Sequence, residues 1–415
     1  MKRVNLASMA WRNLWRNGRR TLLTLASIAL GGFIAVMFTA MQDRSFADFI
    51  DKAARMTDGH VVVQHREYLD RPSLSRLVTD SEELRRQILS DPDVQRVTVR
   101  ITGQALVASA DDNVGVRFIA FDPTLEDSDS LDFLGSVVEG QVFASPQDHG
   151  IVLGAQVAKR LNVALGDKVV YTLTDRHGEL VSGMGRLSGV VSLGTPTADG
   201  TFCLLPIDTV REVLGYGAHE ATRLAVFVSD SRRSQAVAER LSASLPAPTT
   251  ALTWQEAKPE LDAFIAMKVG GARFMELLIV LLVIAGIFNT LFVSVMERSR
   301  EFGIMLAIGF TRWQLFRLII WESVWLGAAG LVAGALVTVG PYVYLNRNGM
   351  DLSAMMGGQT TEVAGVGFDP LIRFGIFPEN AVFIAVGIFV ATLLTGLYPA
   401  HRAGRLEPVQ AIKLV

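Results

Sequence analysis

Four apolar runs alternate with polar segments along this chain of 415 residues. The runs cover residues 22–41, 274–295, about 315–345, and 381–398. A helix needs about 20 apolar residues to cross the roughly 30 Å of hydrocarbon in a bilayer, and each run approaches or exceeds that length. The pattern therefore predicts four membrane-spanning helices, with one long polar region between the first two.

Basic residues indicate the direction of these spans, because Lys and Arg collect on the cytoplasmic side. The N-terminal segment, the loop after the second run and the C-terminal tail are rich in Lys and Arg, while the loop between the third and fourth runs carries only Arg347 and Arg373. We therefore expect both termini in the cytoplasm and the long polar region outside. A signal peptide is the alternative for the first run, but the run is long for a signal peptide.

These patterns together give a domain plan. The expected segments are a cytoplasmic interfacial helix at 1–21, a first span at 22–42, a periplasmic domain at 43–272, a second span at 273–296, a cytoplasmic helix at 297–313, a third span at 314–345, a short periplasmic loop at 346–379, a fourth span at 380–400 and a cytoplasmic tail at 401–415. The first helix has an apolar face with Trp11 and Trp15 and a basic face with Arg12 and Arg16. This helix either serves only to set the membrane topology, or it lies on the inner leaflet and also borders a partner.

The region 43–272 reads as an α+β domain. Segments 43–100 and 201–272 each contain a strand, a polar helix and a second strand, which predicts an α/β base. Between them, 101–200 is β-rich, with hairpin turns expected at 111–113 and 175–178. The expected fold is four transmembrane helices with a large α+β periplasmic domain, an α/β base into which a β-rich lobe is inserted.

The sequence shows no site chemistry of its own. It contains no GxSxG, HExxH or GxxxxGK[ST] pattern, and Cys203 is its only cysteine. His60 and His65 flank a predicted strand on opposite faces, so we expect ordinary surface histidines and no shared metal. We expect no catalytic residue, no bound cofactor, no metal site and no nucleic-acid partner. If ATP drives this protein, another polypeptide binds it.

The segment 296–316 is charged and amphipathic and lies between two predicted spans. One face of a helix here is apolar, at spacings of three and four residues: Phe302, Met305, Leu306 and Gly309. The opposite face is polar but is interrupted by Ile304 and Ile308. A helix with apolar residues on more than one side suits a segment clasped by a partner protein. The alternative is a helix packed only on its own bundle.

Three motif groups outside and beside the spans carry a family resemblance. They are RNLWRN at 12–17 with RRT at 19–21, ERSREFG at 297–303 with LAIGFT at 306–311, and YPAHRA at 398–403 with EPVQAI at 407–412. Together they resemble the FtsX/MacB-type ABC transporter permeases, also called the mechanotransmission or type VII class. Within that family, FDP at 121–123, IVLG at 151–154 and GDKV at 166–169 are most similar to the lipoprotein-releasing LolC/LolE branch.

The resemblance implies partners for this chain. It implies a permease dimer, of like or unlike subunits, with two copies of a separate ABC ATPase that bind ATP and Mg²⁺. The segment 297–310 would be the coupling helix seated in a groove of the ATPase. The implied coupling residues are Glu297, Arg298, Arg300, Glu301, Phe302, Gly303, Met305, Leu306 and Gly309.

The resemblance also implies a function, transmission of ATPase motion to the periplasmic domain, which would extract lipoproteins or other lipidated cargo from the outer leaflet of a bacterial inner membrane. The alternatives are macrolide or peptide efflux with an adaptor and an outer-membrane channel, and mechanical control of a periplasmic enzyme. Membrane lipid and a periplasmic chaperone or adaptor are the further expected partners.

Three features of the predicted spans need assignment. Gly327, Gly330 and Gly334 have the spacing that lets helix backbones approach, within one chain or between two. The apolar residues Phe33, Met37 and Ile284 are candidate contacts for a lipid chain, or else ordinary lipid-facing residues. Glu322 lies within the third span, where a carboxyl group must be neutral, paired or near the inner interface.

Overall fold

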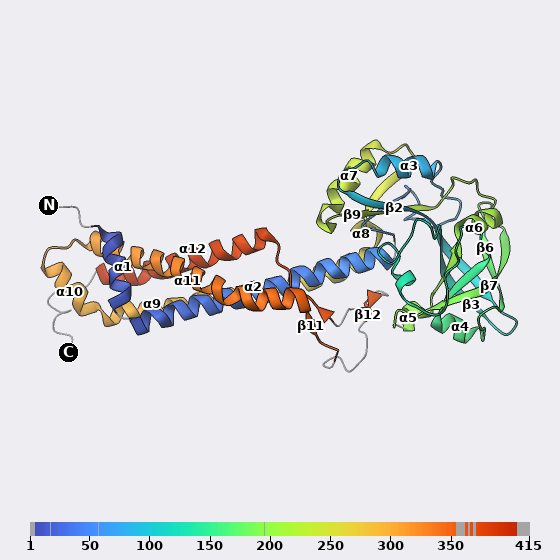
Figure 1. Cartoon of the computed structure of the whole chain (residues 1–415). Helices are drawn as coiled ribbons and strands as arrows, with labels where there is room; N and C mark the ends of the chain where they lie inside the picture. The colour runs from blue at the N-terminus through green and yellow to red at the C-terminus, as the bar shows by residue number, and fades with distance from the viewer. Residues whose placement is uncertain are drawn as a thin grey trace. The chain divides into compact units, whose positions relative to one another are not determined.

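The structure is a computed structural model that describes residues 5–16, 18–56, 58–194, 196–353, 362–363, 366–367 and 371–404. The chain divides into two compact units (Figure 1). The helical unit comprises Met1–Ser45, Met267–Asp351 and Leu371–Val415, and the sheet unit comprises Phe46–Ala266 and Leu352–Pro370. The motif at 407–412 and the basic residues Arg405 and Lys413 lie outside the described residues.

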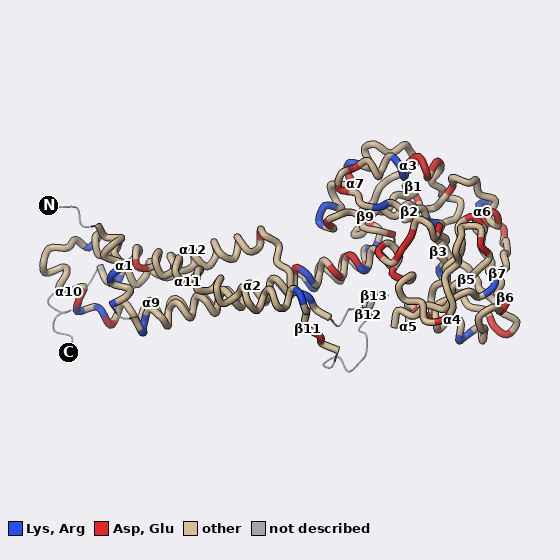
Figure 2. Tube along the Cα trace, viewed as in Figure 1, with Lys and Arg blue, Asp and Glu red and all other residues tan. Residues whose placement is uncertain are grey.

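Four long helices make up most of the helical unit. They are α2 (Gly18–Met56), α9 (Pro259–Glu297), α11 (Arg312–Asn348) and α12 (Pro378–Gly404). Each contains a stretch long and apolar enough to cross a membrane. Charged residues gather near the helix ends and leave the middle parts mostly uncharged (Figure 2). These four helices and the α+β sheet unit confirm the predicted fold class.

The first and second spans belong to longer helices than the hydrophobic pattern indicates. Helices α2 and α9 each have 39 residues, so each is about 60 Å long. Helix α2 continues past the expected boundary at residue 42, because no helix breaker stands in the polar stretch before Gly59. Helix α9 begins at Pro259 rather than at residue 273, since proline suits the first turn of a helix. Both helices therefore run without interruption from one unit into the other.

The N-terminal helix α1 (Leu6–Arg16) packs on α11. Its Ala10 and Leu14 are buried. The ring of Trp11 lies 5.1 Å from that of Trp325, and Nε1 of Trp325 donates to the carbonyl oxygen of Ala7 at 3.1 Å. The helix is thus fixed to a membrane-spanning helix by both packing and a hydrogen bond.

A four-stranded antiparallel sheet with two helices makes the base of the sheet unit. Its elements are β1 (Val61–His65), α3 (Ser81–Ile88), β2 (Val94–Ala108), β9 (Arg223–Val228), α7 (Ser234–Ser244) and β10 (Thr249–Thr253). The spatial order is β10-β1-β9-β2. The two predicted strand–helix–strand units are therefore interleaved, each with a strand of the other between its own two, as in a ferredoxin-like split βαβ arrangement.

The inserted lobe is a closed ring of six strands. Strand β2 pairs with β3 (Asn113–Phe121), then β8 (Phe202–Pro206), β5 (Gly150–Gly154), β7 (Leu180–Val191) and β6 (Lys168–Thr174), which returns to β2. Strand β4 (Val137–Gly140) adds to β7 outside the ring. Both predicted hairpins are present, between β2 and β3 and between β6 and β7. Closure leaves the ring with no free sheet edge.

Strand β2 belongs to both the base and the ring. Its first half pairs with β9, and its second half pairs with β3 and β6. Arg100 is the residue of transfer, opposite Arg223 in β9 and Phe121 in β3. Because β8 closes the ring, the lobe extends beyond residue 200, where the sequence pattern ended it.

Shorter elements complete the chain. They are η1 (Asp132–Gly135), α4 (Ala155–Arg160), α5 (Pro196–Asp199), α6 (Ile207–Leu214), η2 (Ser231–Arg233), α8 (Trp254–Ala257), α10 (Ser299–Ala307), and the two-residue strands β11 (Met350–Asp351), β12 (Glu362–Val363), β13 (Val366–Gly367) and β14 (Leu371–Ile372). Among these, α6 covers the ring and α10 joins the second and third spans.

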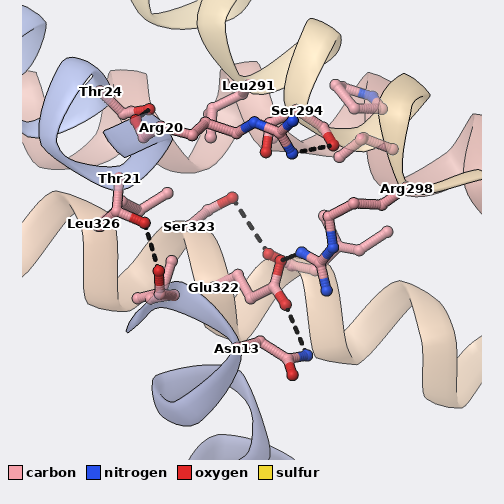
Figure 3. Close-up of a pocket in the computed structure, with 15 residues that line it drawn as sticks. Asn13, Arg20, Thr21, Thr24, Leu291, Ser294, Arg298, Glu322, Ser323 and Leu326 are labelled. Atoms are coloured by element: carbon pink, nitrogen blue, oxygen red, sulfur yellow. Dashed lines mark hydrogen bonds and ion pairs between the residues drawn. The ribbon is translucent and has the colours of Figure 1, made fainter. Parts of the chain in front are cut away.

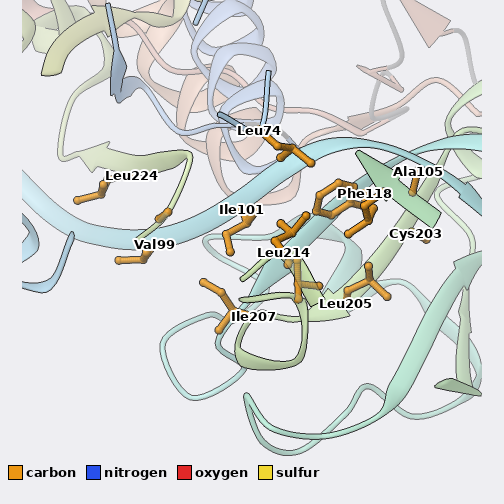
Figure 4. Packing of buried hydrophobic residues seen from close by; sticks show 14 of the residues in the cluster. Leu74, Val99, Ile101, Ala105, Phe118, Cys203, Leu205, Ile207, Leu214 and Leu224 are labelled. Atoms are coloured by element: carbon orange, nitrogen blue, oxygen red, sulfur yellow. The ribbon is translucent and has the colours of Figure 1, made fainter. Parts of the chain in front are cut away.

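One apolar core runs through the base and the ring (Figure 4). It contains Leu224 from the base, Ile101 from β2, and Phe118 and Cys203 from the ring. Beside it, Arg100 and Glu126 form a fully buried ion pair, with Nε to Oε1 at 2.6 Å and Nη2 to Oε2 at 2.9 Å. A core shared in this way makes the base and the ring one cooperative body.

The prediction that His60 is a surface residue is wrong. Its Nε2 lies 2.9 Å from Oδ1 of Asp51, and its Nδ1 accepts from the backbone N–H of Val228 at 3.3 Å. His60 is 6% exposed, because the segment that follows α2 packs it against β9. No cluster of His, Cys, Asp and Glu among the described residues could hold a metal ion.

Candidate coupling site

The connection between the second and third spans is a short helix held by tight turns. Helix α10 follows Arg298 directly and ends at Ala307. Gly309 has φ of +103°, a conformation that favours glycine. Two residues later Thr311 begins α11 with a capping box, in which Gln314 and Thr311 satisfy each other's backbone N–H groups at 2.8 and 3.2 Å. These turns fix the direction of α10.

The apolar face of α10 that the sequence indicates packs on the chain's own helices. Phe302 is fully buried, and Met305 and Leu306 pack beside it. The surrounding buried residues come from α1, α9, α11 and α12: Ala10, Val295, Leu315, Leu318, Ile319, Ala400 and Ala403. This face is therefore occupied before any partner arrives.

The free face of α10 is the one with the two isoleucines. Ile304 is 47% exposed and Ile308 is 73% exposed, and Arg300 beside them is also exposed. Ile304 and Ile308, which directly follows α10, are one helical turn apart and together offer an apolar contact to another protein. The sequence analysis treated them as interruptions of a polar face. Their spacing of four residues was the signal that could have identified them.

A buried ion pair ties the start of α10 to the third span (Figure 3). Nη1 of Arg298 lies 2.8 Å from Oε2 of Glu322, and Nε of Arg298 lies 3.2 Å from Oε2 of Glu301. Nδ2 of Asn13 donates to the other oxygen of Glu322 at 3.0 Å. Of the states expected for Glu322, the structure shows the paired one.

Two further ion pairs connect the N-terminal segment to the same loop. Arg16 pairs with Glu301, and Arg20 pairs with Glu297. Nη1 of Arg20 also lies 3.3 Å from the carbonyl oxygen of Ser294. These pairs are more exposed than the Arg298–Glu322 pair, so each contributes less on its own. Together they link α1, the beginning of α2, the end of α9 and α10.

The cavity among these residues is small. Arg20, Thr24, Leu291, Arg298 and Glu322 are among the residues that line its volume of about 30 Å³ (Figure 3). That is room for one or two water molecules and for no substrate. This cavity is therefore too small to hold a substrate among the ion-paired residues.

Comparison with known protein families identifies the family of this chain. The MacB-like periplasmic core domain family matches residues 21–244, and the FtsX-like permease C-terminal family matches residues 273–408. The chain belongs to the FtsX/MacB-type ABC transporter permeases. In this permease the FtsX-like match covers the second to fourth spans and α10, and the MacB-like match covers α2 and most of the sheet unit.

Several curated proteins are similar to the permease. The lipoprotein-releasing system transmembrane protein LolC of Haemophilus influenzae is 24% identical over 311 residues, covering 74% of this chain and 72% of the relative. LolE of the same organism is 21% identical over 368 residues, covering 85% of each. The macrolide export ATP-binding/permease protein MacB of Nitrobacter winogradskyi is 24% identical over 434 residues, covering 98% of this chain and 60% of the relative.

A solved structure also resembles part of the permease. The periplasmic region of MacB from Actinobacillus actinomycetemcomitans is 15% identical and superposes with a TM-score of 0.34, covering 49% of this chain and 92% of that structure.

The three candidate glycines of the permease contact other helices of the same chain. A Cβ at Gly330 would lie 2.6 Å from Ile28 of α2, and one at Gly327 would lie 3.1 Å from Phe389 of α12. Gly334 faces the backbone of Ala29 at 3.4 Å. The spacing alone allowed packing within one chain or between two chains. The contacts that the structure shows are within the chain.

The structure does not bring the three candidate lipid contacts together. Phe33 and Met37 pack in one cluster with Phe374, and Ile284 lies half-buried on α9. A groove of about 270 Å³ runs instead between α2, α11 and α12, lined by apolar residues that include Val36, Gly330 and Ile384. None of the three candidates lines this groove.

Proposed function

We propose that the permease is the membrane subunit of an ATP-driven transporter, and that its ATPase docks on the free face of α10. The observation that carries this is the exposed pair Ile304 and Ile308 on a helix whose other face is already packed. The sequence has no phosphate-binding loop. The name of the MacB relative includes ATP-binding, which supports an ATP-driven transporter. ATP and Mg²⁺ would bind to the ATPase subunit.

The coupling residues then fall into groups with different roles. Ile304, Ile308 and Arg300 would touch the ATPase. Phe302, Gly303, Met305 and Leu306 would pass its movement to the bundle, since they contact it. Glu297, Arg298 and Glu301 would keep α10 attached to its neighbours through their ion pairs, and Gly309 would set the turn.

Movement of α10 would reach the sheet unit through α2 and α9. Both helices run unbroken between the units, and Arg20 and Glu297 join them near the coupling site. A helix transmits displacement along its axis because its backbone hydrogen bonds lie along that axis. Substrate need not cross the bilayer in this mechanism. The ATPase would act on one side and the sheet unit would handle cargo on the other.

We propose lipoproteins or other lipidated molecules as cargo, taken from the outer leaflet of a bacterial inner membrane. The names of the LolC and LolE relatives support lipoprotein release. Lipid chains would meet the groove between α2, α11 and α12, which adjoins the cluster that contains Phe33 and Met37. Efflux with an adaptor is the second candidate, supported by the macrolide exporter that aligns over 98% of this chain.

The assembly would be a permease dimer with two ATPase subunits, both permease termini in the cytoplasm and the sheet unit in the periplasm. A periplasmic chaperone or adaptor would complete it. Purification of the tagged permease from its native membrane, followed by mass spectrometry, tests this assembly. We expect an ABC ATPase and lipid-modified protein in the complex. Recovery of an adaptor and an outer-membrane channel would favour efflux, and absence of any ATPase would contradict the proposal.

The docking face is tested with the ATPase recovered in that complex. Ile308→Asp should lower permease-stimulated ATP hydrolysis at least about tenfold, because a carboxylate enters the centre of an apolar contact. Leu180→Asp is the matched control, since Leu180 is 76% exposed on the sheet unit. Equal stimulation by Ile308→Asp and the wild-type permease would remove α10 from the interface.

A further inference from the structure

The sheet unit contains a cavity of about 570 Å³ at the place where β2 passes from the base into the ring. Strands β2, β3 and β9 contribute Thr102, Arg117 and Arg223 to its wall. The chain segments that adjoin α2 and α9 contribute Asp58 and Lys258. The volume lies within the range of sites that hold small ligands.

Positive charge dominates this wall. Three lining residues are basic, Arg117, Arg223 and Lys258, and Asp58 is the one acidic residue among them. Asp58 is engaged already, because it pairs with Arg223 and lies 3.9 Å from Nζ of Lys258. The nearby Arg100 is neutralised by Glu126. The cavity therefore keeps an excess of positive charge.

Arg117 is the cation left available. Its backbone N–H donates to the carbonyl oxygen of Thr201 at 2.7 Å, while its guanidinium has no hydrogen bond or ion pair with the residues that the structure describes. The side chain is exposed at the mouth of the cavity. An exposed guanidinium with no carboxylate partner is available to bind a carboxylate or phosphate group.

The electrostatics of the wall favour an anion. Burial lowers the pKa of Lys258, the repulsion from Arg117 and Arg223 lowers it further, and Asp58 and Glu260 oppose the shift only in part. A bound anion would relieve this repulsion. Arg223 is already held in place, because its guanidinium stacks 4.6 Å from the centre of the Tyr68 ring. An arginine fixed in this way binds carboxylate or phosphate oxygens with little loss of side-chain freedom.

We infer that this cavity is a binding site for a small anionic ligand, a carboxylate or phosphate group attached to an apolar body. The anionic group would lie between Arg117 and Lys258, and the body would lie against Tyr68, Met56 and Ile119, which also form the wall. The inference goes beyond the transport function and does not rest on it, since it requires only the sheet unit's own residues.

The place of the site in the chain gives it a connection to the long helices. Asp58 comes two residues after the end of α2, and Lys258 directly precedes α9. A ligand bound beside these two side chains therefore lies next to the ends of the two helices that continue into the first and second spans.

Calorimetric titration of the purified full-length permease in detergent tests the site. The probes are hippurate, which carries a carboxylate on an aromatic body, phenyl phosphate, which carries a phosphate, and hippuramide, the uncharged analogue of hippurate. We expect at least one anion to bind and hippuramide not to bind. The stronger of the two anions identifies the group that the site prefers.

Variants locate the binding. Arg117→Gln should weaken anion binding about tenfold, the effect of losing one charge-assisted contact. Arg160→Gln is the matched control, because Arg160 is an exposed arginine at the end of α4, outside the cavity. No binding of either anion up to about 10 mM, equal binding of hippuramide, or full binding by Arg117→Gln would each overturn the inference. Arg117 is exposed, so its substitution leaves the fold intact.

Discussion

Nη1 of Arg298 lies 2.8 Å from Oε2 of Glu322, and this pair joins the connection between the second and third spans to the third span. Both side chains are about nine-tenths buried. A buried carboxylate or guanidinium without a partner is unfavourable, so each residue permits the burial of the other. Asn13 satisfies the second carboxylate oxygen, which adds the N-terminal helix to the same joint.

Removing only one member of this pair should destabilise the permease. Arg298→Gln leaves Glu322 buried without its charged partner, which costs about 3–5 kcal/mol in comparable buried pairs. We expect a lower thermal unfolding midpoint in detergent for Arg298→Gln. The double variant Arg298→Gln, Glu322→Gln should recover much of the loss, because no buried charge remains.

Arg300→Gln is the control for this experiment, since Arg300 is an exposed arginine on the same short helix. Its unfolding midpoint should match that of the wild type. A double variant less stable than Arg298→Gln alone would contradict this account, because it would show that Glu322 without Arg298 is not an unfavourable buried charge.

Close packing between α2 and α11 gives a second prediction. A Cβ at Gly330 would lie 2.6 Å from Ile28, whereas one at Gly340 of the same helix would meet nothing within 4 Å. Gly330→Ala should therefore lower stability by about 1–3 kcal/mol through overpacking. Both substitutions bring the same gain in helix propensity. Gly340→Ala should therefore be neutral or slightly stabilising, because its Cβ meets no neighbouring atom. Equal thermal midpoints for the two variants would contradict the packing assignment.

Asp58 predicts a pH dependence. Burial alone would raise the pKa of Asp58, but Arg223 and Lys258 outweigh it, so the pKa lies below its ordinary value. A carboxyl group with a lowered folded-state pKa stabilises the protein above its ordinary pKa of about 3.9, and this contribution is lost as the pH falls through the folded-state value.

The measurement compares thermal unfolding of the wild type and Asp58→Asn at pH 7 and near pH 3. At pH 7 the variant should unfold at a lower temperature, and the difference should shrink in acid. Asp70→Asn, at an exposed carboxyl group of the same unit, should show no such difference. If the difference in unfolding temperature between the wild type and Asp58→Asn became larger in acid, the conclusion that folding lowers the pKa of Asp58 would be wrong.

The proposed orientation is tested by labelling. Cys203 is fully buried, and burial raises the pKa of its thiol, so it should react little. A cysteine at the exposed hairpin position Asp112 should react with an impermeant thiol reagent in cells whose outer membrane is permeabilised. A cysteine at Arg300 should react only after lysis. The opposite result for the two positions would place the sheet unit in the cytoplasm.

Much of the fold could be predicted from the sequence because its signals are local. Apolar runs identified the four spans, and the turn residues at 111–113 and 175–178 identified both hairpins. The length of α2 and α9 could not be predicted in this way, because hydropathy ends where the bilayer ends while helical backbone continues through polar residues.

The candidate sites were harder to predict from the sequence, because they depend on contacts between segments that lie far apart in the chain. The apolar face with Phe302 was identified correctly as apolar, but the periodicity does not say whether the bundle or a partner covers it. The anion cavity joins Asp58, Arg117 and Arg223, which lie far apart in sequence. Each looks like an ordinary surface charge until the sheet brings them together.

The sharing of β2 has a consequence for protein engineering. Since this strand completes both the four-stranded sheet and the six-stranded ring, excision of the ring would leave half of β2 with bare backbone amides and carbonyls. A truncated permease of that kind should self-associate along the exposed strand. Exchange of domains among related permeases would therefore succeed only when the whole of Phe46–Ala266, and not the ring alone, is exchanged.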